Sequence, residues 1–247
     1  MKLKTSMLTA LGVFALASAN AGEKAVCCAP TPADLGVTLG VGYDSHYIFR
    51  GVNNGENAIW TSLDYAIPST PLSVGVRYIN PTDGGVANPW HGDELDLSLR
   101  ASQDVGFATV WVGYTAYLFP ENAGRNGGDA THEVGLGLAK SLGVVDLGVA
   151  AYYDFEIDGW FFDLNGSKSI AITDGIDVKL SAGITYGVDY WTNGSGFNNV
   201  YLRAGVPVKL CERATLEPYL GATFALDQID AFQDDQLFGG VSLNVTF

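Results

Sequence analysis

The feature that most restricts the fold of this chain is an alternation of apolar and small or polar residues over unusually long segments. Between Leu35 and Phe49 nearly every second residue is apolar, whereas the residues between them are mostly glycine or polar. Successive side chains of a β-strand point to opposite faces, so this pattern predicts a strand with one apolar and one polar face. The segment is far longer than the roughly five or six residues of a usual globular strand.

The same alternation recurs along the rest of the chain and predicts twelve strands, or ten if one hairpin folds differently. A barrel in a bilayer has this pattern, with apolar side chains facing lipid and polar side chains inside. Closure also leaves no unpaired strand edge in the lipid. The predicted fold class is therefore all-β: a transmembrane, antiparallel, up-and-down β-barrel over residues 35–247.

The connections between the predicted strands fall into two length classes, as in barrels with short periplasmic turns and long outer loops. The short turns lie at residues 68–71, 102–106, 141–143, 173–175 and 211–214. The longer connections lie at 52–57, 80–92, 120–130, 191–198 and 227–235, and the tight connection at 158–159 is the exception on that side. Both termini are then expected on the periplasmic side.

Aromatic residues of the apolar parity gather near the predicted outer loops. They are Tyr47, Phe49, Tyr78, Tyr153, Phe155, Trp160, Phe162, Tyr186 and Tyr190. Outer-membrane barrels carry girdles of aromatic side chains at the membrane interface. We therefore expect these rings to face lipid.

The N-terminus has the features of a secretory signal peptide. Lys2 and Lys4 precede an uncharged apolar segment, and residues 19–21 form an Ala-Asn-Ala cleavage site. This predicts a signal peptide over 1–21, a periplasmic segment over 22–34 and a location in the cell outer membrane. No later segment reaches the roughly 18 consecutive apolar residues of a transmembrane helix. With 13 basic against 27 acidic residues, the chain lacks the basic patch that nucleic-acid binding requires.

Two segments resemble known sequences of the Gram-negative envelope. Ser-His-Tyr-Ile-Phe-Arg-Gly, from Ser45 to Gly51 and preceded by Tyr43-Asp44, is similar to the S-x-Y-x-F-R-G opening of the uncharacterised Gcw_chp family. The closing alternation from Leu243 to the terminal Phe247 resembles the signal by which outer-membrane barrels reach the barrel-assembly machinery. The resemblances imply an envelope location and a barrel fold, and no particular function.

Charged and polar residues of the inward parity form the candidate site. They are Asp44, His46, Arg50, Arg77, Asp96, Arg100, Glu133, Asp154, Lys179, Asp189 and Arg203. Opposed basic and acidic walls orient small polar solutes, and the excess of acids predicts a porin-like channel that is weakly selective or prefers cations. The same charges could instead pair inside a closed barrel, which would be structural or bind a partner through its extracellular loops.

No catalytic arrangement stands out in the sequence. There is no G-x-S-x-G motif, so a third interpretation, a lipid-hydrolysing barrel, would depend on His46 or His132. We predict no enzyme activity, no metal and no cofactor. The expected partners are outer-membrane lipid and lipopolysaccharide, the barrel-assembly machinery and small polar solutes, without nucleic acid. A disulfide from Cys27 or Cys28 to Cys211 is topologically allowed in the oxidising periplasm.

Overall fold

A computed structural model describes residues 35–86, 92–122 and 130–247. The predicted signal peptide, the periplasmic segment, Cys27 and Cys28 lie outside these residues, so their predictions stay predictions. Within the described part of the chain, no helix has the length and hydropathy needed to span a bilayer.

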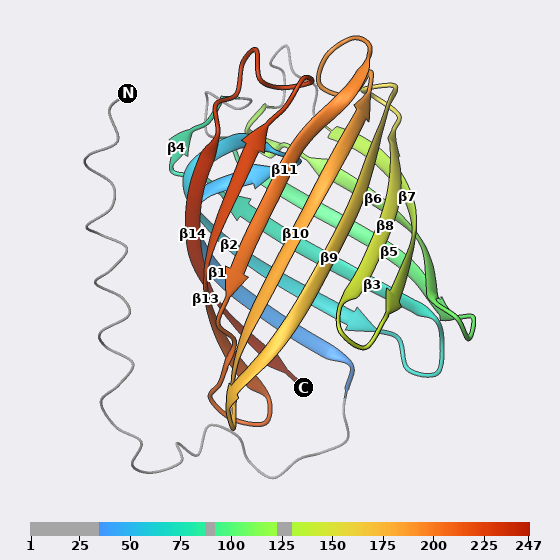
Figure 1. The fold of residues 1–247 in the computed structure, drawn as a ribbon, viewed down its shortest axis with the longest axis vertical. Coiled ribbons are helices and arrows are strands. Elements are labelled where there is room, and N and C mark those ends of the chain that lie inside the picture. The colour runs from blue at the N-terminus through green and yellow to red at the C-terminus, as the bar shows by residue number, and fades with distance from the viewer. Residues whose placement is uncertain (1–34, 87–91, 123–129) are drawn as a thin grey trace.

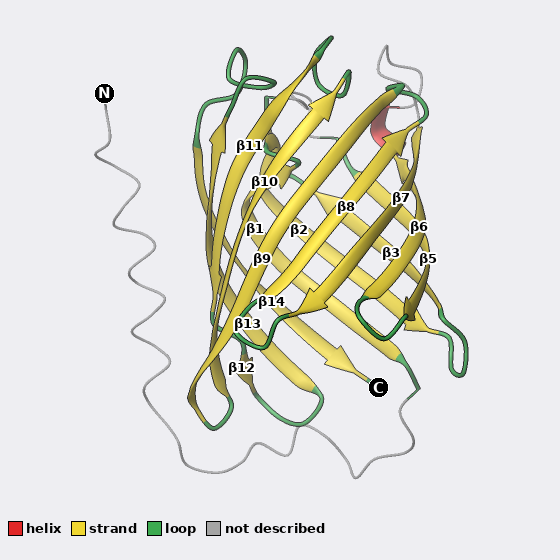
Figure 2. Ribbon diagram, turned by 45° about the vertical axis from the view of Figure 1, so that its right-hand side comes forward, coloured by secondary structure: helices red, strands yellow, loops and turns green. Residues whose placement is uncertain are grey.

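Twelve antiparallel strands form a closed barrel in which neighbours in sequence are neighbours in the wall (Figures 1 and 2). They are β1 (Val37–Phe49), β2 (Val52–Ala66), β3 (Leu72–Asn80), β5 (Glu94–Asp104), β6 (Thr109–Leu118), β7 (Ala130–Ser141), β8 (Asp146–Asp154), β9 (Gly159–Thr173), β10 (Ile176–Val188), β11 (Ser195–Gly205), β13 (Ala214–Ala225) and β14 (Gln236–Thr246). β1 pairs with both β2 and β14, which closes the sheet on itself. The predicted barrel with twelve strands is confirmed.

Three short elements complete the described structure. β4 (Asp83–Gly84) lies in the connection between β3 and β5 and pairs with the start of β2. β12 (Val208–Lys209) continues the course of β11 beyond Pro207 and, like β11, lies between β10 and β13. A 3-10 turn, Pro120–Asn122, follows β6. We call the end of the barrel with Val37 and Thr246 the inner end, and the opposite end the outer end.

The outward face of the wall is apolar, as the alternation predicts. Val76, Leu99 and Leu136 expose 43%, 47% and 58% of their surfaces, and similar side chains project from the other wall strands. A soluble monomer rarely exposes a continuous apolar surface of more than a few hundred Å². An apolar band around a barrel is instead the surface that a bilayer covers.

Part of the predicted aromatic girdle is present on β8 and β9. Trp160 and Phe162 are exposed, and the Trp160 ring lies 5.0 Å from Tyr153 and 6.1 Å from Phe162 between centroids. Three of the expected lipid-facing rings, Tyr47, Phe49 and Tyr190, instead lie inside the barrel.

Two of the three inward rings, Tyr47 and Phe49, follow the point where β1 leaves the wall. Pairing of β1 with β14 stops at Asp44–Gly240, so the parity of the wall no longer sets the direction of the later side chains. The β1–β2 register also shifts between Tyr47 and Ile48, where Asn54 is the extra residue on β2. Tyr190 is inward for another reason: it follows the end of β10 and the left-handed residue Asp189, so strand parity no longer applies to it.

The predicted outer loop at 52–57 is wrong, because these residues begin strand β2. The turn between β1 and β2 consists of Arg50 and Gly51, whose φ values are 50° and 85°. Positive φ at both central residues is the requirement of a type I′ turn, the tight connection of a two-residue hairpin.

The outer ends of β1 and β2 leave the barrel wall. Pairing of β1 with β14 stops at Asp44–Gly240, and pairing of β2 with β3 stops at Ile59–Asn80. Residues 45–57 pair across their own two strands and with β4, and we call this segment the lumen hairpin.

Candidate functional site

The tip of the lumen hairpin crosses the barrel and docks on the opposite wall through Arg50. Its guanidinium Nη1 lies 2.5 Å from Glu133 Oε2 on β7 and donates a hydrogen bond of 2.5 Å to the Tyr190 hydroxyl. Strands β7, β8 and β9 lie across the closed barrel from β1 in the strand order. These contacts therefore pass through the lumen.

Four aromatic rings surround the Arg50 guanidinium. Its central carbon lies 4.6 Å from the ring centroids of Tyr152 on β8 and Phe161 on β9, 4.8 Å from Tyr190 and 5.0 Å from Phe49. A cation over an aromatic face is stabilised by about 0.5–2 kcal/mol, most when water is excluded. Burial raises the pKa of the Tyr190 hydroxyl above its ordinary value, so the ring stays neutral beside the cation.

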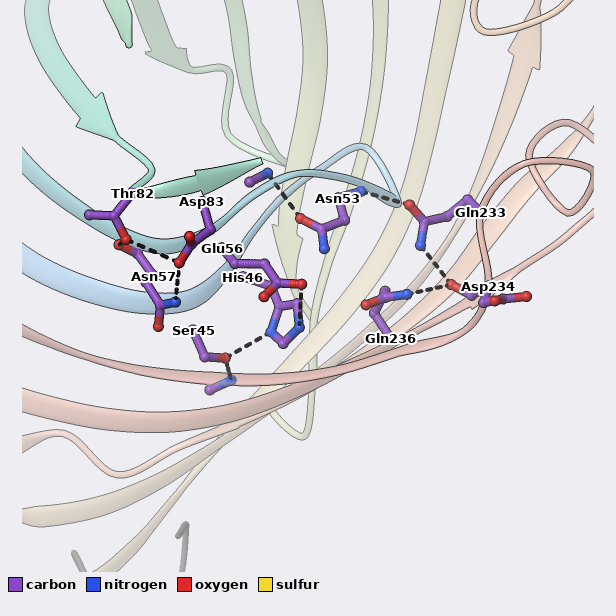
Figure 3. Close-up of polar contacts among 12 residues, drawn as sticks. Ser45, His46, Asn53, Glu56, Asn57, Thr82, Asp83, Gln233, Asp234 and Gln236 are labelled. Carbon is purple, nitrogen blue, oxygen red and sulfur yellow. Dashed lines mark hydrogen bonds and ion pairs between the residues drawn. The ribbon is translucent and has the colours of Figure 1, made fainter. Parts of the chain in front are cut away.

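Backbone groups of the hairpin tip are also held. Asn198 on β11 donates its Nδ2 hydrogen to the Arg50 carbonyl at 2.8 Å. The Asn53 amide donates to Gln233 Oε1 at 2.9 Å, and Gln233 belongs to the connection between β13 and β14 (Figure 3). A Cβ atom on Gly51 would lie 2.7 Å from the Asn199 side chain, so the tip fits closely against β11.

The base of the lumen hairpin carries His46, one of the predicted site residues (Figure 3). His46 Nδ1 lies 3.0 Å from Ser45 Oγ, and Nε2 lies 3.9 Å from Glu56 Oε1. Ser45 Oγ also accepts a hydrogen bond from the Gly239 amide of β14 at 3.0 Å. This last contact links the hairpin to the wall just beyond the final β1–β14 pair.

Side-chain burial shows that the outer half of the lumen is filled. Val52 in the hairpin is fully buried, and so are inward residues near the outer ends of the wall strands: Glu133, Asp154, Phe161, Asn198, Asn199 and Thr223. By contrast, the inward residues Asp64 and Arg100, nearer the inner end, are exposed. Among the described residues, inward side chains are thus buried toward the outer end and exposed to solvent toward the inner end.

A second charged group lies beside the lumen hairpin, on β3 and β5. The buried Tyr47 hydroxyl donates to Glu94 Oε1 at 2.7 Å. Arg77 is paired in register with Asp96 across β3 and β5, and its guanidinium lies 5.1 Å from the Trp60 ring centroid. Arg77 and Asp96 are therefore brought together as inward wall residues.

A third group joins β1 to β11 and β13. Arg203 Nη2 lies 2.6 Å from Glu217 Oε1, and its guanidinium carbon lies 4.2 Å from the Tyr219 centroid. The Tyr219 hydroxyl donates to Asp44 Oδ1 at 2.6 Å. Asp44 and Arg203 thus contact the same tyrosine, Asp44 at its hydroxyl and Arg203 at its ring.

The remaining predicted site residues do not join these groups. Arg100 lies over the Trp111 ring at 4.2 Å, and Lys179 is exposed near the inner end of β10. Asp154 accepts hydrogen bonds from the Glu156 and Ile157 amides and from Thr131, and so holds the β8–β9 turn.

Asp189 likewise stabilises a turn, the one between β10 and β11. Its carboxylate accepts a hydrogen bond from the Gly194 amide at 2.6 Å, and its own amide donates to the Gly194 carbonyl at 2.7 Å. The predicted site is therefore several separate clusters along the lumen rather than one constriction.

Sequence reasoning missed the aromatic residues around Arg50. Tyr152 and Phe161 have inward parity in the sequence, so two large rings among small inward residues were an available signal for a partner inside the lumen. Phe49 and Tyr190 gave no such signal, because Phe49 lies beyond the end of the β1–β14 pairing and Tyr190 lies in a turn. Nor did the sequence indicate that Asn198 faces the hairpin tip.

Several solved structures resemble the chain. A KdgM porin in complex with disordered oligogalacturonate has 6% sequence identity and a TM-score of 0.57, and the match covers 85% of this chain and 99% of that one. LpxR from Salmonella typhimurium has 9% identity, a TM-score of 0.53 and coverage of 85% and 100%. An outer membrane channel from Pseudomonas putida F1 has 14% identity, a TM-score of 0.50 and coverage of 88% and 99%.

Identities this low show likeness of fold alone. No protein-family model matches the chain, so the resemblance to the Gcw_chp family is not confirmed, and no curated protein matches it either. The neighbours in fold nevertheless include outer-membrane porins and channels that the match covers almost completely. The chain is therefore a closed, antiparallel, twelve-stranded β-barrel with the fold of outer-membrane porins.

Proposed function

We propose that the protein is a porin-like channel of the outer membrane that passes small polar solutes passively. The observation that carries this proposal is the contrast between the two faces of the wall: the outward face is apolar, whereas the inward face bears charged side chains that meet solvent near the inner end. A purely structural barrel has no need of a hydrated, charged inner half. The porin fold supports the same function.

The inward charges favour cations or neutral solutes. Carboxylates outnumber cationic groups on the inward face below the lumen hairpin: Asp44, Asp64, Asp96, Asp146, Asp163, Asp177 and Glu217 against Arg77, Arg100, Lys179 and Arg203. A wall with an excess of one charge concentrates the opposite ion. We therefore expect weak cation preference in the conducting state.

Planar-bilayer recording tests both parts of the proposal. Purified protein should produce discrete conductance steps, and a salt gradient across the bilayer should give a reversal potential of the sign expected for cations. A clear anion preference would contradict the assigned selectivity. Absence of conductance from a folded barrel whose lumen hairpin has been shortened would contradict the channel itself.

The second candidate is a closed barrel that is structural or binds a partner through its outer loops. The filled outer half of the lumen favours this candidate in the conformation described, because the hairpin residue Val52 and the wall side chains around the hairpin tip are buried. The two candidates differ in whether the hairpin ever leaves the lumen. They are separated by the same conductance measurement.

A further inference from the structure

The lumen hairpin differs from the rest of the barrel in how it is held. Wall strands are paired on both sides through backbone hydrogen bonds, but the pairings of β1 with β14 and of β2 with β3 end before the hairpin begins, at Asp44–Gly240 and Ile59–Asn80. Beyond these pairs the hairpin keeps its own strand pairing and two pairs with β4, from Gly55 to Gly84 and from Glu56 to Asp83. Its backbone pairing therefore joins the wall at one end only, and the Tyr47–Glu94 hydrogen bond is a side-chain contact along its length.

Side chains hold the free end of the lumen hairpin. The contacts are the Arg50–Glu133 ion pair, the Arg50–Tyr190 hydrogen bond and the two hydrogen bonds made through Asn198 and Gln233. A backbone ladder must break bond by bond, whereas these contacts all lie at or next to one turn. Their loss would free the tip without unfolding any wall strand.

Arg50 is the centre of this attachment. Its guanidinium is buried between Glu133 and four aromatic rings, and a buried charge that loses its partner costs about 3–5 kcal/mol. The docked tip and the water-exposed tip are therefore the two favourable states for this side chain, and a half-released state is not. Two discrete arrangements of one element are what a gate requires.

We propose that the lumen hairpin is a gate: it closes the outer half of the barrel while Arg50 is docked between β7 and β9, and it swings toward the outer mouth when that contact breaks. The hinge lies where the wall pairing of β1 and β2 ends. This inference rests on the proposed channel function, since a gate has meaning only in a barrel that conducts.

Three variants test the gate in planar bilayers. Replacing residues 47–55 by Asn-Gly closes the hairpin directly after the His46–Glu56 pair with a favourable two-residue turn and removes the docked tip. Arg50→Ala removes the ion pair and the hydrogen bond that dock the tip, but it keeps the hairpin. Lys140→Ala is the matched control, because it deletes one cation from an exposed position at the inner end of β7.

The gate predicts low conductance for the native protein and full conductance for the shortened hairpin. Arg50→Ala should raise the time-averaged conductance by about tenfold or more, the change that corresponds to loss of about 1.4 kcal/mol of docking free energy. Lys140→Ala should behave like the native protein. Each variant is first shown to be folded by its heat-dependent mobility on a gel and its far-ultraviolet circular dichroism.

The outcomes separate the gate from the channel. If the shortened hairpin does not conduct, the channel function is wrong. If the shortened hairpin conducts but Arg50→Ala conducts as little as the native protein, the barrel is a channel and docking of Arg50 does not hold it closed. Native conductance equal to that of the shortened variant would also overturn the gate. Should Arg50→Ala fail to fold, Glu133→Gln decides the question, because it keeps the shape of the partner and removes its charge.

Discussion

The outward parity of the wall makes a prediction about a single leucine in the middle of β5. Leu99 is paired in register with Val74 on β3 and Tyr114 on β6, both of which are also exposed on the outer face. If this face meets the hydrocarbon core of a bilayer, Leu99→Arg places a guanidinium near the bilayer midplane. The matched control is Ser98→Arg, which places the same group on the inward face of the same strand.

The expected cost follows from two contributions. The 47% of its surface that Leu99 exposes would face hydrocarbon, so the whole side chain leaves water on folding and its replacement forfeits about 1.5–3 kcal/mol. An arginine on the lipid face near the midplane adds about 2–4 kcal/mol. The folding equilibrium of Leu99→Arg in lipid should therefore fall by about a hundredfold or more, at 1.4 kcal/mol for each factor of ten.

Equilibrium unfolding in denaturant, with the protein refolded into lipid vesicles, measures this cost. Leu99→Arg should lower the free energy of unfolding by several kcal/mol, whereas Ser98→Arg should change it much less, because its guanidinium reaches water in the lumen. Equal costs for the two variants would refute the assignment of the outward face to lipid. The argument would also fail if Leu99→Arg were neutral.

Three further substitutions test other parts of the interior. Gly42→Val should destabilise the barrel by about 1–3 kcal/mol in the same unfolding assay, because a Cβ atom there would lie 2.4 Å from the Trp60 ring. Asp154→Ala should cost about 1–3 kcal/mol, since it removes a buried carboxylate and leaves the Glu156 and Ile157 amides without their acceptor, and calorimetry of the folded barrel should show a lower unfolding temperature. Tyr190→Phe keeps the ring over Arg50 but removes a hydrogen bond to a charged group, worth about 1.5–3 kcal/mol, and should raise the open fraction in single-channel records.

The strands of the wall could be predicted from the sequence because apolar and polar side chains alternate regularly along them. Lipid outside and a polar lumen inside force opposite chemistry onto alternate residues, so parity assigned Leu99 and Arg100 to the correct faces without any knowledge of the partner strands. The strand count followed from the same period and from the turns between strands.

The lumen hairpin could not be predicted, because it depends on departures from that period. The end of wall pairing at Asp44 and the positive φ of Arg50 set the course of the hairpin, and neither leaves a mark in an alternation of apolar and polar residues. Arg50 was identified as an inward residue, but its docking on Glu133 joins positions far apart in the chain. Such a contact is settled by the closure of the barrel rather than by local sequence.

The inward path of the lumen hairpin also decides which connections reach the cell surface if the barrel lies in the outer membrane. An epitope inserted at Gly51 would be enclosed by β11 and withheld from antibodies, phage and proteases outside the cell. The connection between β10 and β11 offers the opposite situation, since Gly194 is exposed and a side chain added there would meet no atom within 4 Å. A peptide inserted at Gly194 should be accessible from outside the cell. The barrel would therefore display a peptide at Gly194 and enclose one inserted at Gly51.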